Sequence, residues 1–167
     1  VWKIDSAHTN ADFSVRHLMI SNVKGHFSKV SGNVDYDGKD LKSLKIDAAI
    51  EVASVETGEK GRDEHLKGAD FFDAAKFPTM TFRSTKVHFA GDLPASVDGT
   101  LTLVGVSKPV TLTFERFKCA QNPFNKKDRC GGNAVGKFKR SDFGMKYAIP
   151  AVGDEVTLSI EFEGDKE

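Results

Sequence analysis

A strict alternation of apolar and polar residues runs through most of this chain and limits what it can fold into. The alternation is clearest in ADFSVRH (11–17), LKIDAAIEV (44–52) and VTLSIEFE (156–163). Each segment has one apolar and one polar face, which is typical of antiparallel sheets rather than of the buried parallel sheets of α/β proteins. About eight such segments can be counted, and eight strands close into a barrel just wide enough for one small ligand. The sequence therefore predicts an all-β fold, an eight-stranded antiparallel barrel with one or two short helices that spans residues 1–167 as a single domain.

Two stretches interrupt the alternation and are candidates for helix. HLMISNV (17–23) is compatible with a short helical turn, and ETGEKGRDEHLKGADFF (56–72) has a helix-like middle. LTLVGVSKPVTLTF (101–114) has the chemistry of a hairpin, with Gly105 and Pro109 flanking its turn. We therefore expect the longest excursion from the barrel between residues 56 and 72.

The charge of the chain is balanced, with 24 basic and 24 acidic residues and a formal net charge of zero. Lys126, Lys127 and Arg129 come nearest to a basic run, but Asp128 interrupts them, and we interpret them as part of a solvated loop. Nucleic acids and anionic membrane surfaces recruit clustered basic residues, so neither is expected as a main partner. The longest apolar runs span only a few residues, which predicts no integral membrane segment.

Phenylalanine dominates the aromatic residues, since 13 Phe stand against two Tyr and one Trp. Tyr and Trp carry a polar group that needs a partner when it is buried, whereas Phe carries none. This composition suits a dry interior, which is either a solid core or a ligand cavity.

Cys119 and Cys130 flank a stretch rich in turn formers, AQNPFNKKDR (120–129). We expect them at the base of a loop between two strands, where a disulfide would close a loop of about a dozen residues. Two free thiols in a cytosolic protein are the alternative, while the lack of a CxxC spacing and of further cysteines argues against redox and zinc sites. We favour the disulfide. Because the first residue, Val1, is not an initiator Met, we expect a processed protein of the periplasm or a secreted protein.

The segment GRDEHLKGADFFDAAKFP (61–78) combines residue types of catalytic and metal sites with those of apolar pockets. Metal ligands on a helix recur at i and i+3 or i+4, but the residues at those positions around His65 are Arg, Gly and Ala. No metal site is therefore expected. Asp63 and Lys67 are expected to form an i,i+4 ion pair, and Arg62 to bond a carboxylate or a carbonyl at a strand end. The phenylalanines of the second half are expected at the rim of a pocket.

Motifs for nucleophilic catalysis are missing from the sequence. It has no GxSxG, no SxxK and no phosphate-binding glycine loop, and the DFG within RSDFG (140–144) lacks the other kinase motifs. His17 continues the apolar face of residues 11–15. Two interpretations are open for it, a core histidine with satisfied hydrogen bonds or a polar contact at the mouth of a cavity.

Taken together, the motifs resemble those of the YceI-like family, a lipocalin-like group of bacterial proteins that bind polyisoprenoid lipids. The matching segments are WKIDSAHTNADFSVRH, VKGHF, TGEKGRDEHLKGADFFDAAKFPTMTF, VDGTLTLVGVSKPVTL, RSDFG and VGDEVTLSIEFE. They cover nearly the whole chain, and the central one with its FFD…FP ending is the most specific. The resemblance implies an eight-stranded barrel with a short helix and an elongated apolar tunnel, export to the periplasm, frequent homodimers and no established catalysis.

The ligands implied by the resemblance are ubiquinone, polyprenyl phosphates and fatty amides. The insertion between the cysteines resembles a subgroup with quinone-binding and antibiotic-capturing periplasmic members. A tunnel of Phe and aliphatic side chains would remove such a lipid tail from water, where its apolar surface costs about 25 cal/mol per Å². We therefore predict non-catalytic carriage or sequestration of a long isoprenoid lipid, ubiquinone-like or polyprenyl phosphate, and of hydrophobic antibiotics.

Two alternatives remain open at this stage. One is an enzyme that acts on a prenyl lipid with His17 or His65 as the general base. The other is a filled barrel that works through protein contacts. The residues expected to line the tunnel, each of which belongs to a solid core if the barrel is filled, are Phe13, His17, Phe27, Ile46, Ile50, Phe71, Phe72, Phe77, Met80, Phe82 and Phe143.

Overall fold

The computed structural model describes residues 2–35 and 44–167. In this part of the chain most residues belong to strands, and one α-helix, α1 (Lys60–Lys67), interrupts them. The strands are β1 (Trp2–Ile4), β2 (Asn10–His17), β3 (Ser21–Phe27), β4 (Val30–Asp35), β5 (Lys45–Glu51), β6 (Val55–Glu56), β7 (Thr79–Ala90), β8 (Leu93–Leu103), β9 (Val106–Gln121), β10 (Asp128–Lys139) and β11 (Val152–Lys166). Short 3₁₀ turns are η1 (Ser6–His8), η3 (Val52–Ser54) and η4 (Arg140–Phe143).

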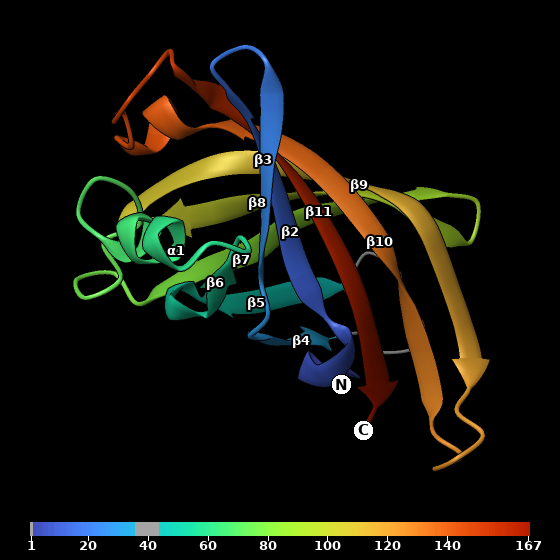
Figure 1. Cartoon of the computed structure of the whole chain (residues 1–167). Coiled ribbons are helices and arrows are strands. Elements are labelled where there is room, and N and C mark those ends of the chain that lie inside the picture. Colours follow the sequence, from blue (N-terminus) through green and yellow to red (C-terminus); the bar gives the residue numbers. More distant parts are fainter. Residues whose placement is uncertain (1, 36–43) are drawn as a thin grey trace.

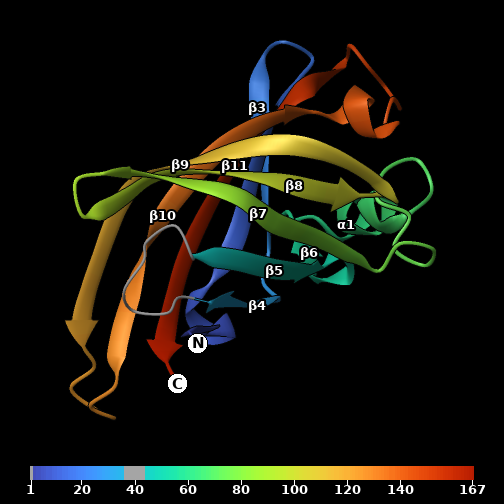
Figure 2. The same ribbon diagram turned by 180° about the vertical axis from the view of Figure 1, so that it is seen from behind.

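The strands close into a barrel (Figures 1 and 2). Eight of them form the ring in the order β1-β4-β5-β7-β8-β9-β10-β11, which the pairing of β11 with β1 closes. Strand β11 is long enough to pair also with β2, and β3 and β6 follow on from β2. Every pairing is antiparallel. The predicted eight-stranded antiparallel barrel with a short helix is confirmed.

Helix α1 lies at one end of the barrel, away from the β9–β10 hairpin (Figures 1 and 2). The expected Asp63–Lys67 ion pair is wrong, because Asp63 instead accepts hydrogen bonds from the backbone N–H and hydroxyl of Thr57, and Lys67 pairs with Glu64. The expected bond from Arg62 to a carbonyl at a strand end is confirmed, since it donates to the Thr57 carbonyl directly after β6. The helix is thus held to the end of β6 by its own polar face.

Two local predictions differ from the structure. Residues 17–23 form the β2–β3 hairpin rather than a helical turn, because β2 and β3 pair up to His17 and Ser21. The hairpin at 101–114 is confirmed, but its turn is Val104-Gly105, where both residues have positive φ, and Pro109 already lies in β9 opposite Thr100.

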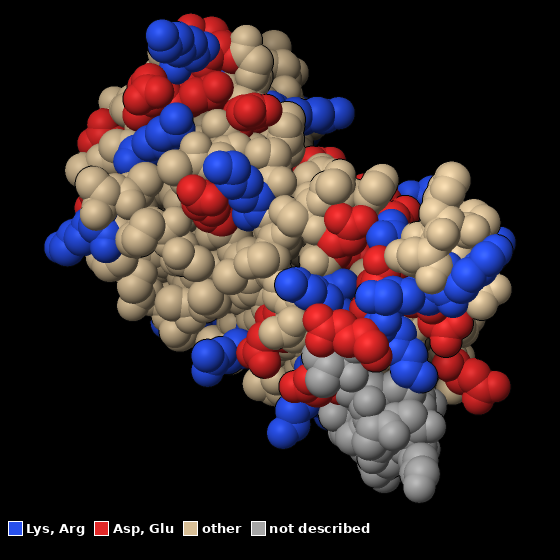
Figure 3. Space-filling model, turned by 90° about the horizontal axis from the view of Figure 1, so that it is seen from below, with Lys and Arg blue, Asp and Glu red and all other residues tan. Residues whose placement is uncertain are grey.

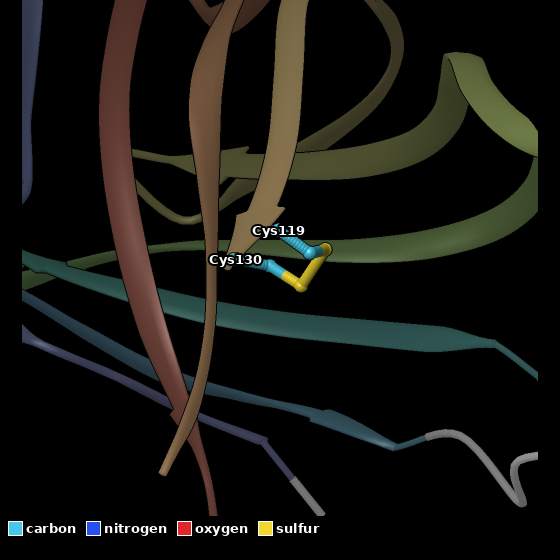
Figure 4. Close-up of a disulfide and its surroundings, with 2 residues drawn as sticks. All are labelled: Cys119 and Cys130. Carbon is cyan, nitrogen blue, oxygen red and sulfur yellow. A yellow bond between two sulfur atoms is a disulfide. The ribbon is translucent and has the colours of Figure 1, made fainter. Parts of the chain in front are cut away.

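Two crosslinks hold the far end of the barrel. The predicted disulfide between Cys119 and Cys130 is present and joins directly opposed residues of β9 and β10 (Figure 4). In the adjacent turn residues 126–127 are exposed, as expected of a solvated loop. Arg129 is the exception, because it belongs to β10 and donates hydrogen bonds to Asp5, Glu163 and Asp165. It thereby joins β10 to β11 and to the residue that follows β1.

The surface carries charge of both signs. On the face seen from below in Figure 3, basic and acidic side chains are interspersed and neither sign forms a large patch. This face therefore lacks the clustered positive charge with which proteins bind a phosphate backbone. Among the described residues, no helix is both long and apolar enough to cross a membrane.

Candidate functional site

An apolar cavity of about 280 Å³ lies inside the barrel beneath α1. Side chains from β2, β3, β5, β7, β8, β10 and β11 form its wall, and α1, the loop after it and the loop between η4 and β11 close it. The volume is nearly twice that of an apolar cavity of about 150 Å³ that binds benzene in another protein. The barrel is therefore hollow at this end, and the space suits an apolar ligand.

Seven of the predicted lining residues line this cavity. They come from four strands and from the loop after α1, and they are Phe13, His17, Phe27, Ile50, Phe71, Phe72 and Met80. The two residues of this loop, Phe71 and Phe72, are partly exposed, which is consistent with a place at the rim. His17 is exposed at the end of β2, so it lies at the cavity mouth and is not a core histidine.

The other four predicted lining residues lie outside the cavity wall. The rings of Phe82 and Phe77 cover Gly99 and Gly105, where a Cβ atom would collide with them. Phe143 is 2% exposed and packs edge-to-face on Phe138, with ring centroids 5.4 Å apart. The last is Ile46, which lies in β5 opposite Val34.

Aromatic rings close the mouth of the cavity. Phe72 meets Phe27 edge-on at a centroid distance of 5.3 Å, which joins the loop after α1 to β3. His65, Phe71 and Tyr147 form a triangle of edge-on contacts at 5.0, 5.4 and 5.4 Å. Edge-on aromatic pairs contribute about 0.5–1.5 kcal/mol beyond their buried area. These rings therefore hold α1 and the loop after it against the loop between η4 and β11.

Sequence reasoning missed three lining residues of a polar kind, Arg62, Arg140 and Tyr147. The sequence indicates for Arg62 only a bond to a carboxylate or to a carbonyl at a strand end, and RSDFG enters only as an excluded kinase motif and as one of the segments of the family resemblance. Arg140 is 3% exposed, and this burial lowers the pKa of its guanidinium, although the charge of Asp154 opposes the change. The sequence contains no signal for the place of Arg140, because the carbonyls that hold it come from residues 145–153.

The two histidines proposed as bases differ in their surroundings. His65 Nε2 lies 2.9 Å from Asp70 Oδ2, and both side chains are about half exposed. For His17 the described residues provide no side-chain hydrogen bond. Among the described lining residues there is no Ser, Thr, Cys or Lys that either imidazole could activate as a nucleophile. The site therefore has the parts for holding an apolar ligand.

A second cluster of polar groups lies away from the cavity. Ligand-type atoms of Asp5, His8 and Glu163 lie within 4.8 Å of one another. Arg129 donates to both of the carboxylates and so supplies a positive charge beside them. The hydrogen bond from His8 is the main cause that lowers the pKa of Asp5, and the hydrogen bond from Arg129 lowers this pKa further. The cluster is therefore an ion network that stabilises the fold.

Comparison with known proteins agrees with this architecture. The sequence profile of the YceI-like domain matches residues 2–164. The chain belongs to the YceI-like family. Protein YceI of Escherichia coli O157:H7 is 38% identical over 165 residues, which cover 98% of this chain and 85% of that protein.

Solved structures of the family superpose on the barrel. A YCEI protein of Campylobacter jejuni is 36% identical, with a TM-score of 0.77 over 91% of this chain and 90% of that one. A polyisoprenoid-binding domain of Saccharophagus degradans is 15% identical, with a TM-score of 0.75 over 99% and 98% of the two chains. This last similarity concerns the fold alone.

Proposed function

We propose that this protein binds a long isoprenoid lipid and carries or sequesters it without changing it. The observation that carries the proposal is the apolar cavity of about 280 Å³ beneath α1. Membership of the YceI-like family supports it, as does the polyisoprenoid-binding relative with the same fold. Ubiquinone-like lipids are the first candidates, polyprenyl phosphates the second, and hydrophobic antibiotics would enter the same space.

Carriage is favoured over chemistry on a lipid by the composition of the wall. Apart from a few polar side chains the wall is apolar, which suits the binding of a lipid tail. The disulfide favours the periplasm or another oxidising compartment, because such bonds persist there and are rare in the cytosol. The homodimer that the resemblance implies is a further proposal, which sedimentation of the purified protein tests.

Native mass spectrometry with solvent extraction of the purified protein tests the proposal directly. We expect a bound lipid, or uptake of a prenyl lipid when the stripped protein is titrated. F72D places a carboxylate in the rim and should weaken uptake at least tenfold, because burying an unpaired charge is costly. F124D is the matched control, since Phe124 is 94% exposed outside the cavity and its replacement should leave uptake unchanged. A protein that is always ligand-free and takes up no prenyl lipid contradicts the proposal.

A further inference from the structure

The ionisable groups of the cavity wall are all basic or neutral. They are Arg62, His65, His17, Arg140 and Tyr147, and among the described residues no Asp or Glu lines the cavity. The remaining wall is apolar. Apolar walls exclude water and focus the field of the charges within them, so two permanent cations here produce a positive potential at the mouth.

Arg140 carries its charge in the interior and forms no ion pair among the described residues, although the charge of Asp154 acts on it from a greater distance. It is 3% exposed, and its guanidinium donates only to backbone carbonyls: Nε to Gly153 at 2.9 Å, Nη1 to Tyr147 at 3.1 Å and, more weakly, to Met145 at 3.4 Å, and Nη2 to Val152 at 2.9 Å. A guanidinium has five N–H donors, so these four bonds leave one N–H, on Nη2. Neutral carbonyls orient the group, and Asp154 compensates its charge only from beyond ion-pair distance, which leaves a cost in a buried position.

Arg62, in α1, is also held by hydrogen bonds to uncharged groups. Its Nε and Nη2 donate to the hydroxyl and the carbonyl of Thr57, both at 2.8 Å, which fixes the plane of the guanidinium. Nη1 makes no hydrogen bond within the described chain. The nearby Asp63 is already bonded to Thr57 and cannot neutralise it without losing those bonds.

The two cations share one aromatic neighbourhood. Cζ of Arg140 lies 5.8 Å from the ring centroid of Phe71, which itself contacts His65 one turn after Arg62 in α1. The arginines that form ion pairs in the described chain, Arg83, Arg116 and Arg129, all lie outside the cavity wall. Two arginines without an ion pair thus line the cavity, the exposed Arg62 at its rim and the buried Arg140 inside it.

We propose that the lipid bound here has an anionic head, a phosphate or a carboxylate, which accepts the free N–H groups of Arg140 and Arg62 while its tail fills the cavity. This inference rests on the proposed function, because the tail must occupy the cavity for the head to reach the mouth. Arginine suits such a head because its planar fork matches oxyanions, and charge-assisted bonds are about twice as strong as neutral ones. A neutral head such as a quinone carbonyl would accept a hydrogen bond but leave both charges unmatched, so this inference places polyprenyl phosphates before the ubiquinone-like lipids among the candidates named above.

Matched lipids that differ only in the head test this inference. The lipid-stripped protein is titrated by calorimetry with geranylgeranyl monophosphate and with geranylgeraniol, and then with palmitate and hexadecanol. We expect at least tenfold tighter binding of the charged member of a pair. A preference in the first pair alone identifies phosphate as the head, and a preference in the second pair shows that a carboxylate is also accepted.

Variants separate recognition of the head from folding. R62Q removes an exposed cation, so the Kd of the alcohol divided by the Kd of its charged partner should fall towards one. R83Q, at an exposed arginine outside the wall, should leave this ratio as in the wild type. At Arg140 the variant is R140K, which keeps the buried charge because a neutral replacement could prevent folding. It should lower the ratio, because lysine lacks the fork geometry of the guanidinium. Equal binding of phosphate and alcohol, or an unchanged ratio in R62Q, overturns the inference while the proposed function stands. If neither lipid of a pair binds, the proposed function itself fails.

Discussion

Ala11 provides a test of whether the barrel is hollow beneath α1. It is 1% exposed and lies in the cavity wall. Leucine at this position adds three carbons, which gain about 0.8 kcal/mol each on burial, against about 0.5–1 kcal/mol of lost rotamer freedom. Because a cavity of about 280 Å³ accepts them without overpacking, we expect A11L to stabilise the lipid-free protein by about 1–2 kcal/mol. At this chain length the gain corresponds to a rise in Tm of roughly 2–8 °C.

The matched control is Ala134, which is 3% exposed in β10 but does not line the cavity. The same change there overpacks a filled interior, which costs about 1–3 kcal/mol and lowers Tm. Thermal unfolding followed by circular dichroism should be measured on lipid-stripped protein, because bound lipid adds its own stabilisation. Lipid uptake should fall in A11L. If A11L loses as much stability as A134L, the space beside Ala11 is already filled and the reasoning is refuted.

Three further changes test what holds the fold. G99A should cost about 1–3 kcal/mol in urea unfolding, because the new methyl group collides with the ring of Phe82; unchanged stability would show that the ring moves freely. Replacing Cys119 and Cys130 by Ser should lower the free energy of unfolding by about 3 kcal/mol in the chain-entropy model, a loss that reduction of the wild type must reproduce. Hydrogen bonds from Arg129 lower the pKa of its partner Asp165 below 3.8, so their stabilisation is present above that pH and is lost as the pH falls through the lowered pKa. R129Q should therefore be less stable than the wild type at pH 7, and the two should converge in strong acid; a difference that is independent of pH would contradict this.

The barrel was predictable from the sequence because alternation is a local property. Each predicted strand has a counterpart in the structure, and the pairing of Cys119 with Cys130 followed from turn formers that lie between them. The helical turn expected at 17–23 failed because three apolar residues at a hairpin tip mimic a helix. Leu18 and Met19 adopt positive φ there, which their side chains disfavour and which no local pattern predicts.

The position of the cavity was only partly predictable, since period two assigns a face and not a depth along the barrel. Ile46 and Ile50 lie on the same face of β5, but only Ile50 reaches the cavity. Met80 and Phe82 differ in the same way on β7. Arg140 was out of reach for a different reason, because its place in the wall depends on carbonyls of residues 145–153, which fold back around it.

The phenylalanines show what decides between core and cavity. Of the 13, only Phe13, Phe27, Phe71, Phe72 and Phe138 line the cavity, so abundance of Phe alone does not imply a hollow barrel. Phe82 and Phe77 fill space because a glycine on a neighbouring segment leaves room for their rings to lie flat. Phe71 and Phe72 cover no such glycine. They come from a loop, so no strand register fixes their rings against the barrel wall. Covering a glycine does not decide the matter alone, because Phe13 covers Gly25 and still lines the cavity. Phe71 and Phe72 close a space that they do not fill, and this space is where a lipid tail would lie.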